Sequence, residues 1–135
     1  YEIKIHRKMI HQNIVRIYEL TETEHRFYVF MELCEGGDVF DFIANKGKLT
    51  EEEAGKIFVQ LVQALQYLHR QKVTHRDIKV ENILLDAEFN VKLADFGFTK
   101  KYASSQQSVD EMLKTFCGSP SYTAPEILNK KDYSG

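Results

Sequence analysis

Residues 75–97 read HRDIKVENILLDAEFNVKLADFG, and two short apolar runs within this stretch decide the local fold. The runs, Ile83–Leu85 and Val91–Leu93, are joined by five residues whose composition favours a turn. They predict an antiparallel hairpin, in which the residue before the first strand lies beside the residue after the second. Asn82 and Asp95 are therefore expected to converge. An amide oxygen and a carboxylate are hard ligands suited to Mg²⁺, which keeps several waters and is usually shared with substrate phosphates.

Asp77 and Lys79 precede Asn82 in a short loop, so they are expected to lie close to it. A carboxylate at this place can orient a hydroxyl, and a lysine can offset negative charge on a transferring phosphoryl group. Taken singly, such residues are more often turn formers or helix caps. Taken together, they predict phosphoryl transfer.

The chain before this stretch predicts further elements. Residues 2–11 mix apolar and cationic side chains in a pattern that favours a helix. Residues 15–20 and 26–33 are rich in β-branched and aromatic side chains and flank the polar residues 21–25, which predicts strand, turn and strand. A glycine pair at 36–37 breaks the pattern before a short amphipathic stretch, residues 39–44.

A second helix follows Thr50, which with Glu53 forms a capping box. Apolar residues then recur at helical spacing, namely Ile57, Leu61, Ala64, Leu65 and Leu68. Residues 100–107 are polar and serine-rich, and the apolar pattern resumes only near Ala124. No repeat or linker divides the chain, so we expect one continuous structural unit.

Composition excludes several classes of protein. The chain has 135 residues, 43% hydrophobic and 28% charged, which is ordinary usage for one soluble domain. Its longest apolar run, residues 27–31, is much shorter than the ~20 residues that span a bilayer, and no leader precedes it. Cys34 and Cys117 lack the spacing of a zinc site or a disulfide framework. A cytoplasmic protein without a membrane or nucleic-acid partner is expected, since the net charge is −2. Tyr1 in place of methionine indicates a processed chain or a piece of a longer one.

Charge is distributed unevenly along the chain. Residues 21–53 carry nine acidic and three basic side chains, whereas residues 54–84 carry two acidic and five basic ones. Most of these charges are expected to lie on solvated faces. The acidic segment also supplies a field that would attract basic peptides.

Three segments resemble protein-kinase motifs in the order that the family has them. Residues 75–82 are similar to the catalytic loop, and residues 95–97 and 124–126, DFG and APE, resemble the two ends of the activation segment. The resemblance implies an α+β, protein-kinase-like two-lobe fold that is incomplete. Residues 1–33 would be the remainder of the small lobe, with its helix C and two strands. Residues 34–135 would hold the hinge, the start of the helical lobe, the catalytic loop and the activation segment.

The same resemblance assigns a binding site for ATP and Mg²⁺. Residues 11–15 look like the family's HPNIV segment, with Gln12 in place of proline, which puts Glu2 at the position of the helix C glutamate. Residues 30–34 look like the strand that enters the hinge. The implied contacts are Met31 as gatekeeper, the backbones of Glu32 and Cys34 against adenine, and Asp38 near the ribose and basic substrate side chains.

Roles in catalysis and regulation follow from the resemblance as well. Asp77, Lys79 and Asn82 would be catalytic, and Asn82 and Asp95 would bind Mg²⁺. Glu81 and Ser119 would contact a protein substrate, with basic residues expected before its acceptor. Arg76 would pair with a phosphate that an upstream kinase places on Thr115.

Two histidines are interpreted as structural residues rather than catalytic ones. His6 stands where the family has a leucine or methionine of the spine linking helix C to Phe96, and two interpretations remain open: a tolerated, partly exposed imidazole, or weakened coupling between the lobes. His75 is expected to pack beneath Phe96 rather than shuttle protons.

The function implied is that of a serine/threonine protein kinase, because Lys79 marks that class, and Phe98 favours serine. Residues 95–100 and 114–120 look most like the testis-specific serine kinases, within the group of calmodulin-dependent and AMP-activated kinases. No glycine-rich loop or β-strand lysine precedes Tyr1, so the isolated chain is expected to be inactive and poorly soluble. The alternatives are a pseudokinase-type regulatory module and a non-enzymatic product of a truncated gene.

Overall fold

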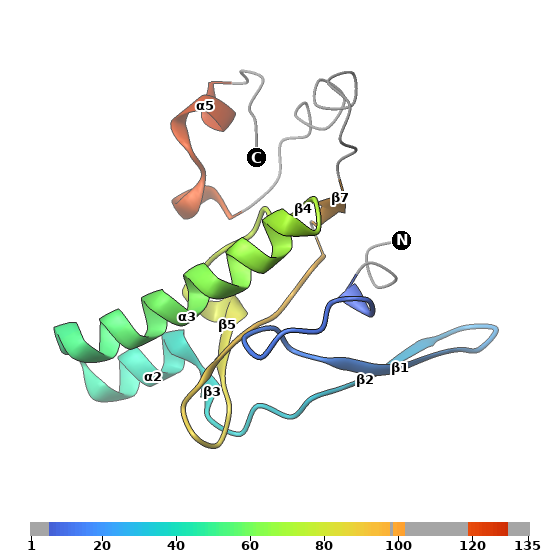
Figure 1. Ribbon diagram of the computed structural model, residues 1–135, viewed down its shortest axis with the longest axis horizontal. Helices are drawn as coiled ribbons and strands as arrows, with labels where there is room; N and C mark the ends of the chain where they lie inside the picture. The colour runs from blue at the N-terminus through green and yellow to red at the C-terminus, as the bar shows by residue number, and fades with distance from the viewer. Residues whose placement is uncertain (1–5, 98, 102–118, 130–135) are drawn as a thin grey trace.

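A computed structural model describes residues 6–97, 99–101 and 119–129 (Figure 1). The predictions for Glu2, Phe98, Thr115 and Cys117 lie outside these residues. No helix in the described ranges is both long enough and apolar enough to cross a membrane.

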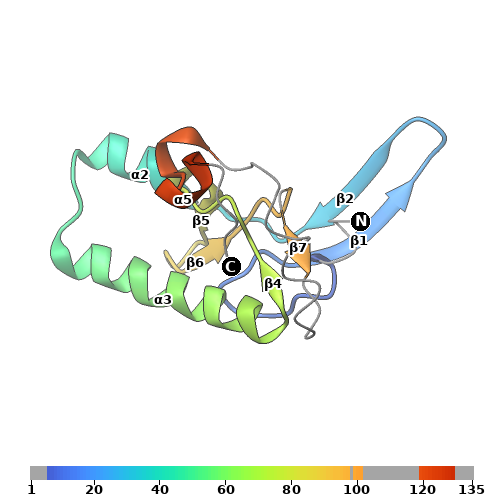
Figure 2. The same cartoon turned by 90° about the horizontal axis from the view of Figure 1, so that it is seen from above.

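The first two strands form a hairpin that projects from the rest of the described chain (Figures 1 and 2). β1 (Ile17–Glu22) pairs antiparallel with β2 (Phe27–Met31), and the Thr23 amide donates to the Arg26 carbonyl at 2.8 Å across the turn. The predicted order of strand, turn and strand is confirmed, although β1 begins two residues later than predicted.

The late start of β1 has a cause in the backbone of residues 13–15. The Val15 amide donates to the Leu93 carbonyl at 3.0 Å, and the Leu93 amide donates to the Asn13 carbonyl at 2.9 Å. This pairing also explains why the predicted helix over residues 2–11 is wrong at its end. His6 is the last helical residue, a turn follows, and the chain then extends toward β6.

The predicted β-hairpin is present in a second sheet of order β3-β5-β6. β5 (Ile83–Leu85) pairs antiparallel with β6 (Val91–Leu93), so that Ile83 lies opposite Leu93, and β3 (Gly37–Asp38) pairs with the other edge of β5. β4 (Val73–Thr74) pairs with β7 (Lys100–Lys101). Two-residue strands show no alternation in the sequence, so β3, β4 and β7 were not predicted.

Two helices lie against this sheet, α2 (Val39–Lys46) in contact with β3 and β5, and α3 (Glu51–Arg70) in contact with β6. The capping box of α3 is confirmed: the Glu53 amide donates to Thr50 Oγ1 at 3.2 Å and the Thr50 amide to Glu53 Oε2 at 2.9 Å. Ala64 and Leu68 are fully buried, and the other apolar residues predicted for this helix pack around them, namely Ile57, Leu61 and Leu65. This is the predicted α+β class.

Three short helical elements were not predicted. The 3-10 turn η1 (Val80–Asn82) precedes β5, and η3 (Pro120–Tyr122) precedes α5 (Pro125–Leu128). Proline begins α5 at a position where its fixed φ fits a helix and its missing N–H is not needed.

Candidate active site

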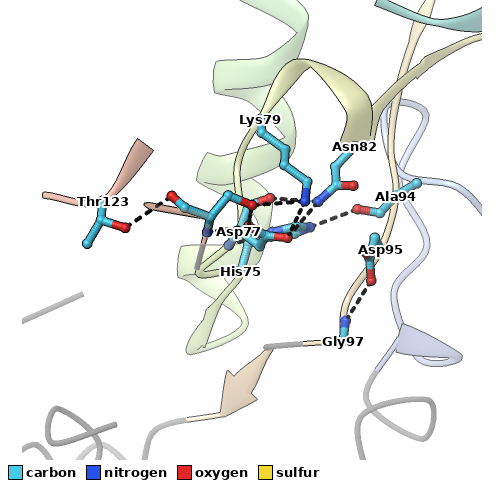
Figure 3. A network of polar contacts seen from close by, with 9 residues as sticks. His75, Asp77, Lys79, Asn82, Ala94, Asp95, Gly97 and Thr123 are labelled. Atoms are coloured by element: carbon cyan, nitrogen blue, oxygen red, sulfur yellow. Dashed lines mark hydrogen bonds and ion pairs between the residues drawn. The ribbon is translucent and has the colours of Figure 1, made fainter. Parts of the chain in front are cut away.

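Asp77 lies at the centre of a network of polar contacts (Figure 3). Its side chain is 4% exposed, and both carboxylate oxygens are engaged. Oδ1 accepts from the hydroxyl of Ser119 at 3.0 Å and from its amide at 3.1 Å. Oδ2 accepts from Asn82 Nδ2 at 3.0 Å and forms an ion pair with Lys79 Nζ at 3.2 Å. The catalytic loop and the segment at residue 119 therefore meet at this carboxylate.

These contacts fix the charge of Asp77. Burial alone would raise the pKa of this carboxyl, but hydrogen bonds from Ser119, Lys79 and Asn82 outweigh it and hold the pKa below its ordinary value. Asp77 is thus an anion at neutral pH and can only accept hydrogen bonds, which is what orienting a substrate hydroxyl requires.

Lys79 connects the two segments. Its Nζ donates to Ser119 Oγ at 2.9 Å while it pairs with Asp77, and its side chain is 22% exposed. The prediction that Ser119 faces Asp77 and Lys79 is confirmed. A cation held here, partly shielded from water, is available to a negatively charged group that approaches Asp77.

The predicted approach of Asn82 to Asp95 is confirmed for the backbone. The Ala94 amide donates to the Asn82 carbonyl at 2.9 Å, which places Asp95 one residue beyond the pairing. The side-chain nitrogen of Asn82, Nδ2, also donates to the Asp77 backbone carbonyl at 2.9 Å. Asn82 Oδ1 is therefore the side-chain atom that can face a cation. Asp95 is exposed, and its Oδ1 accepts from the Gly97 amide at 3.1 Å.

The donor chemistry here fits Mg²⁺. Asn82 and Asp95 both offer oxygen, and a site with two protein oxygens is typical of Mg²⁺ shared with phosphates. Within the described ranges, no group of three His, Cys, Asp or Glu side chains could hold a metal by itself. The residues that would hold the ion are therefore Asn82 and Asp95, together with a phosphorylated ligand.

His75 packs as predicted. It is 2% exposed, its ring lies edge-on to Phe96 at 4.8 Å, and it accepts at Nδ1 from the Asp77 amide at 3.3 Å. Its Nε2 lies 3.0 Å from the Ala94 carbonyl, so the neutral tautomer carries its proton there. Burial lowers the pKa of His75, which keeps it neutral.

His6 is not the partly exposed imidazole that one interpretation expected. It is 7% exposed, stacks on Phe96 with ring centroids 3.9 Å apart, and donates from Nε2 to the Val15 carbonyl at 2.6 Å. Sequence could not anticipate this, because histidine is intermediate in burial and its partner here is a backbone atom.

A cavity of about 330 Å³ brings the predicted gatekeeper Met31 to the same space as Asp95. The residues lining it come from two parts of the chain that lie far apart in the sequence: His6, Val15, Ile17, Val29, Met31, Ala94, Asp95, Phe96 and Gly97. Its walls are mostly apolar, as expected of a site that holds a flat ring.

The predicted hinge lies beside this cavity. The Glu32 amide donates to the Arg16 carbonyl at 2.9 Å, and the Cys34 carbonyl accepts from the Gly37 amide at 3.3 Å. Among the described residues, no backbone pairing uses the Glu32 carbonyl or the Cys34 amide. The Glu32 side chain pairs with Lys92 at 2.5 Å, and burial raises the pKa of the Cys34 thiol, which therefore stays protonated at neutral pH.

Asp38 and Glu81 occupy adjoining elements. Asp38 caps α2 by accepting from the Asp41 amide at 2.8 Å, a role that sequence reasoning missed although an aspartate before an apolar run is a cap signal. Glu81 is exposed on η1, and η1 is in contact with α2. The two residues therefore belong to elements that are in contact with each other.

Arg76 lines a second cavity, of about 200 Å³, with Asp77, Ile78, Ser119, Tyr122, Thr123, Ala124 and Ile127. Its backbone is left-handed, with φ of 69°. This cavity adjoins the Asp77 carboxylate on the side of α5. Tyr122 and Ile127 were missed by sequence reasoning because they belong to elements too short to show periodicity.

Asn13 is a further positioning residue that was missed. It is 2% exposed and donates from Nδ2 to Gln60 Oε1 at 2.9 Å and to the Val91 carbonyl at 3.0 Å. Gln60 Oε1 in turn accepts from the Val91 amide at 2.9 Å. A polar residue just before two buried apolar ones, Ile14 and Val15, was the available signal.

Comparison with known proteins agrees with this arrangement. The family model described as "Protein kinase domain" matches residues 1–135. Two relatives from rice, Oryza sativa, named serine/threonine protein kinase OSK3 and OSK4, are each 49% identical to the chain over 134 residues. The match covers 99% of this chain and 25% of each relative, so the chain spans a quarter of their length. The chain belongs to the protein kinase domain family.

Proposed function

We propose that the full-length protein carrying this chain transfers the γ-phosphoryl group of ATP to serine or threonine hydroxyls of proteins. The observation that carries the proposal is the Asp77 carboxylate held by Lys79, Asn82 and Ser119. The names of the two rice kinases support the class of acceptor.

The proposed step is an in-line displacement. The acceptor hydroxyl oxygen forms a bond to the γ-phosphorus, the bond from that phosphorus to the β,γ-bridging oxygen breaks, and ADP leaves. Asp77 accepts a hydrogen bond from the attacking hydroxyl and takes up its proton as the bond to phosphorus forms. Lys79 offsets charge on the transferred group. Asn82 and Asp95 would hold Mg²⁺, which neutralises charge on the phosphates when bound.

Substitution of Asp77 tests the proposal. Asp77→Asn keeps the size of the side chain but removes its charge, so kcat for peptide phosphorylation should fall by about 10²–10⁴-fold. Asp41→Asn, at an exposed position of α2, is the matched control and should keep wild-type kcat. A wild-type protein that binds ATP but transfers no phosphate would instead support the pseudokinase alternative.

Substrates with basic residues before the acceptor are proposed for the same site. Asp38 and Glu81 supply two carboxylates on adjoining elements, and Asp38 lies within the acidic segment of residues 21–53. Reversing both charges should abolish a preference for arginine in a degenerate peptide library. An unchanged preference would leave these side chains as a solvated acidic face.

Regulation through Thr115 is also part of the proposal. A phosphate there would add about −1.5 to −2 charges, which Arg76 can pair with by charge-assisted hydrogen bonds. Thr115→Ala should sharply lower the activity of the protein after treatment with an upstream kinase, whereas Ser104→Ala should not. Retained activation in Arg76→Ala would contradict this switch.

The proposal also includes a kinase subgroup and a cellular location. Residues 95–100 and 114–120 support a place near the testis-specific serine kinases, and the lack of cysteine pairing motifs supports a cytoplasmic protein. Serine should be preferred over threonine as acceptor because of Phe98. A peptide pair that differs only in the acceptor residue tests this preference.

A further inference from the structure

A polar cavity of about 330 Å³ opens where residues 12 and 13 meet α3 and the chain on either side of β6. It shares no residue with the two cavities of the candidate active site. Its lining residues within the described chain are all polar, and most are carboxamides: Gln12, Asn13, Gln60, Asp86, Asn90 and Lys92. A single water takes up about 30 Å³ of liquid volume, so this cavity has room for a small ligand.

One buried atom of the wall lacks a hydrogen-bond partner. Asn13 is 2% exposed, and its Nδ2 donates to Gln60 Oε1 at 2.9 Å and to the Val91 carbonyl at 3.0 Å. Both hydrogens of this amide are thereby used, whereas no donor among the described residues reaches Asn13 Oδ1. A buried acceptor without a donor is costly and rare in folded proteins. A ligand that donates a hydrogen bond would satisfy this oxygen.

The neighbouring side chains can both donate and accept. Gln60 Nε2 donates to the Lys56 carbonyl at 3.3 Å, and an amide nitrogen carries two hydrogens. Asp86 Oδ2 accepts from Asn90 Nδ2 at 3.1 Å, and a carboxylate oxygen has a second lone pair. Gln12 adds an exposed carboxamide at the position where the kinase motif has proline. The cavity is thus suited to a ligand whose own groups do both.

Charges of both signs in the wall disfavour an ion as the ligand. Burial would raise the pKa of Asp86, but hydrogen bonds from Asn90 and Glu88 outweigh it and hold the pKa below its ordinary value. The resulting carboxylate would repel an anion. Lys92, which pairs with Glu32 at 2.5 Å, presents an ammonium group that would repel a cation. The described lining residues include no aromatic ring on which a flat heterocycle would stack.

We propose that this cavity binds a small neutral molecule rich in hydroxyl groups, of the size of one sugar ring. A hydroxyl both donates and accepts, as the carboxamides of the wall do, and one hydroxyl hydrogen supplies the donor that Asn13 Oδ1 lacks. The site is separate from the catalytic residues, so the proposal does not depend on the kinase function proposed above.

Equilibrium dialysis of the full-length protein tests the site, with radiolabelled D-glucose and myo-inositol as probes. Saturable binding of at least one probe, at one molecule per chain, is expected, with the millimolar Kd of a very small ligand. Gln12→Leu keeps the size of the side chain but removes its amide, and it should weaken binding about fivefold. Gln66→Leu makes the same change at an exposed position of α3 that does not line the cavity, and it should leave binding unchanged.

Gln12 is chosen over Asn13 because substitution of Asn13 also removes the two hydrogen bonds that hold it to Gln60 and β6. The proposal is overturned if wild type binds neither probe saturably. It is overturned equally if Gln12→Leu binds as tightly as wild type.

Charged analogues test the chemistry assigned to the ligand. Gluconate is an anion and glucosamine a cation, and both should bind more weakly than glucose because the wall contains charges of both signs. Tighter binding of either analogue would overturn the assignment of a neutral ligand.

Hydrogen exchange measured by mass spectrometry locates the probe without any substitution. Saturation with the tighter-binding probe should slow amide exchange in peptides covering residues 10–14 and 86–92. Exchange in the β1–β2 turn, residues 22–27, should not change. Slowing confined to residues 29–31 and 94–97 would place the probe in the active-site cavity and overturn the proposal.

Discussion

Two residues of the candidate active site adopt backbone conformations that a sequence does not reveal. Arg76 and Asp95 have φ values of 69° and 56°, and neither is glycine. A left-handed residue costs roughly 1–2 kcal/mol, and such residues cluster where function needs a side chain in a particular place. In Asp95 the conformation accompanies a carboxylate that turns onto the Gly97 amide. The direction of a side chain thus depends here on the loop as a whole.

Substitution of Asp95 should separate metal binding from the orientation of the hydroxyl. Asp95→Asn should weaken the binding of ATP in the presence of Mg²⁺, because it removes a charged ligand oxygen. Asp77→Asn should leave that affinity nearly unchanged while lowering kcat. Nucleotide titrations with and without Mg²⁺ measure both effects. If Asp95→Asn keeps wild-type affinity in Mg²⁺, the assignment of Asp95 as a metal ligand is wrong.

The residues of the site could be identified from sequence better than their contacts. The motifs pointed to Asp77, Lys79 and Ser119, and the structure brings these three together. The double contact of Asn82 with Asp77 was not foreseen, because an amide can turn toward either of two neighbours. The burial of His6 was left open for a similar reason, since its partner is the Val15 carbonyl and carbonyls are present at every residue.

At the scale of elements, α3 differs between its two ends. Its first turn has a complete capping box and three glutamates, which suit the positive end of the helix dipole. Its last residue, Arg70, is followed by Gln71 and then by Lys72, whose φ is 60°. Many helices place glycine at such a position because glycine has no Cβ to strain the turn. The helix is therefore well specified at its start and strained just past its end.

The start of α3 can be weakened by one substitution. Thr50→Ala removes the acceptor of the Glu53 amide and should lower the free energy of unfolding by about 1 kcal/mol. Thr50→Ser keeps a hydroxyl and should restore most of that loss. Denaturant unfolding of the three proteins measures the difference, and equal destabilisation by alanine and serine would exclude the cap as its cause.

The end of α3 can be strengthened. Lys72→Gly should raise the free energy of unfolding by up to about 1 kcal/mol, because glycine adopts a positive φ without strain. Gln66→Gly is the matched control, at an exposed position inside the helix, and should lower stability by about 1 kcal/mol. A loss of stability in both variants would show that relief of strain does not dominate at Lys72.

Elements with a strong local signal were predicted, and elements made by distant pairing were not. The hairpin of β5 and β6 has the predicted bounds, since two apolar triplets and a turn determine it locally. β4 and β7 exist only because residues 73–74 meet residues 100–101. The same argument applies to residues 13–15, whose pairing with β6 joins residues far apart in the sequence and was not predicted.

At the scale of the whole molecule, three rings in contact connect the start of the described chain to residues 75–82. His6 lies against one side of Phe96 and His75 meets the ring edge-on. Both imidazoles are buried, and burial lowers the pKa of each. The connection therefore contains two groups that must stay neutral to remain where they are.

Acidification should weaken this connection. The folded state holds both imidazoles below their ordinary pKa of 6.5, so the unfolded state binds more protons just under that pH. Stability from neutral histidine is thus fully present above about pH 6.5 and is lost as the pH falls further. His6→Leu, which cannot protonate, should show a smaller drop in Tm between about pH 7.5 and 5.5 than wild type. His25→Leu, in the exposed β1–β2 turn, should behave as wild type, and an equal effect of both variants would contradict the role of His6.

The pairing of β6 on both of its sides has a consequence for dissection of the chain. β6 forms backbone hydrogen bonds with β5 on one edge and with residues 13–15 on the other. These hydrogen bonds therefore connect the two parts of the chain that the kinase motifs distinguish, residues 1–33 and residues 34–135. Cleavage at the glycine pair, Gly36 and Gly37, would leave each piece with half of a shared ladder. Neither piece should fold alone, but the two should reassociate when mixed, as in complementation of a split reporter. Residues 13–15 thus extend the sheet of β3, β5 and β6, although they belong to the other part of the chain.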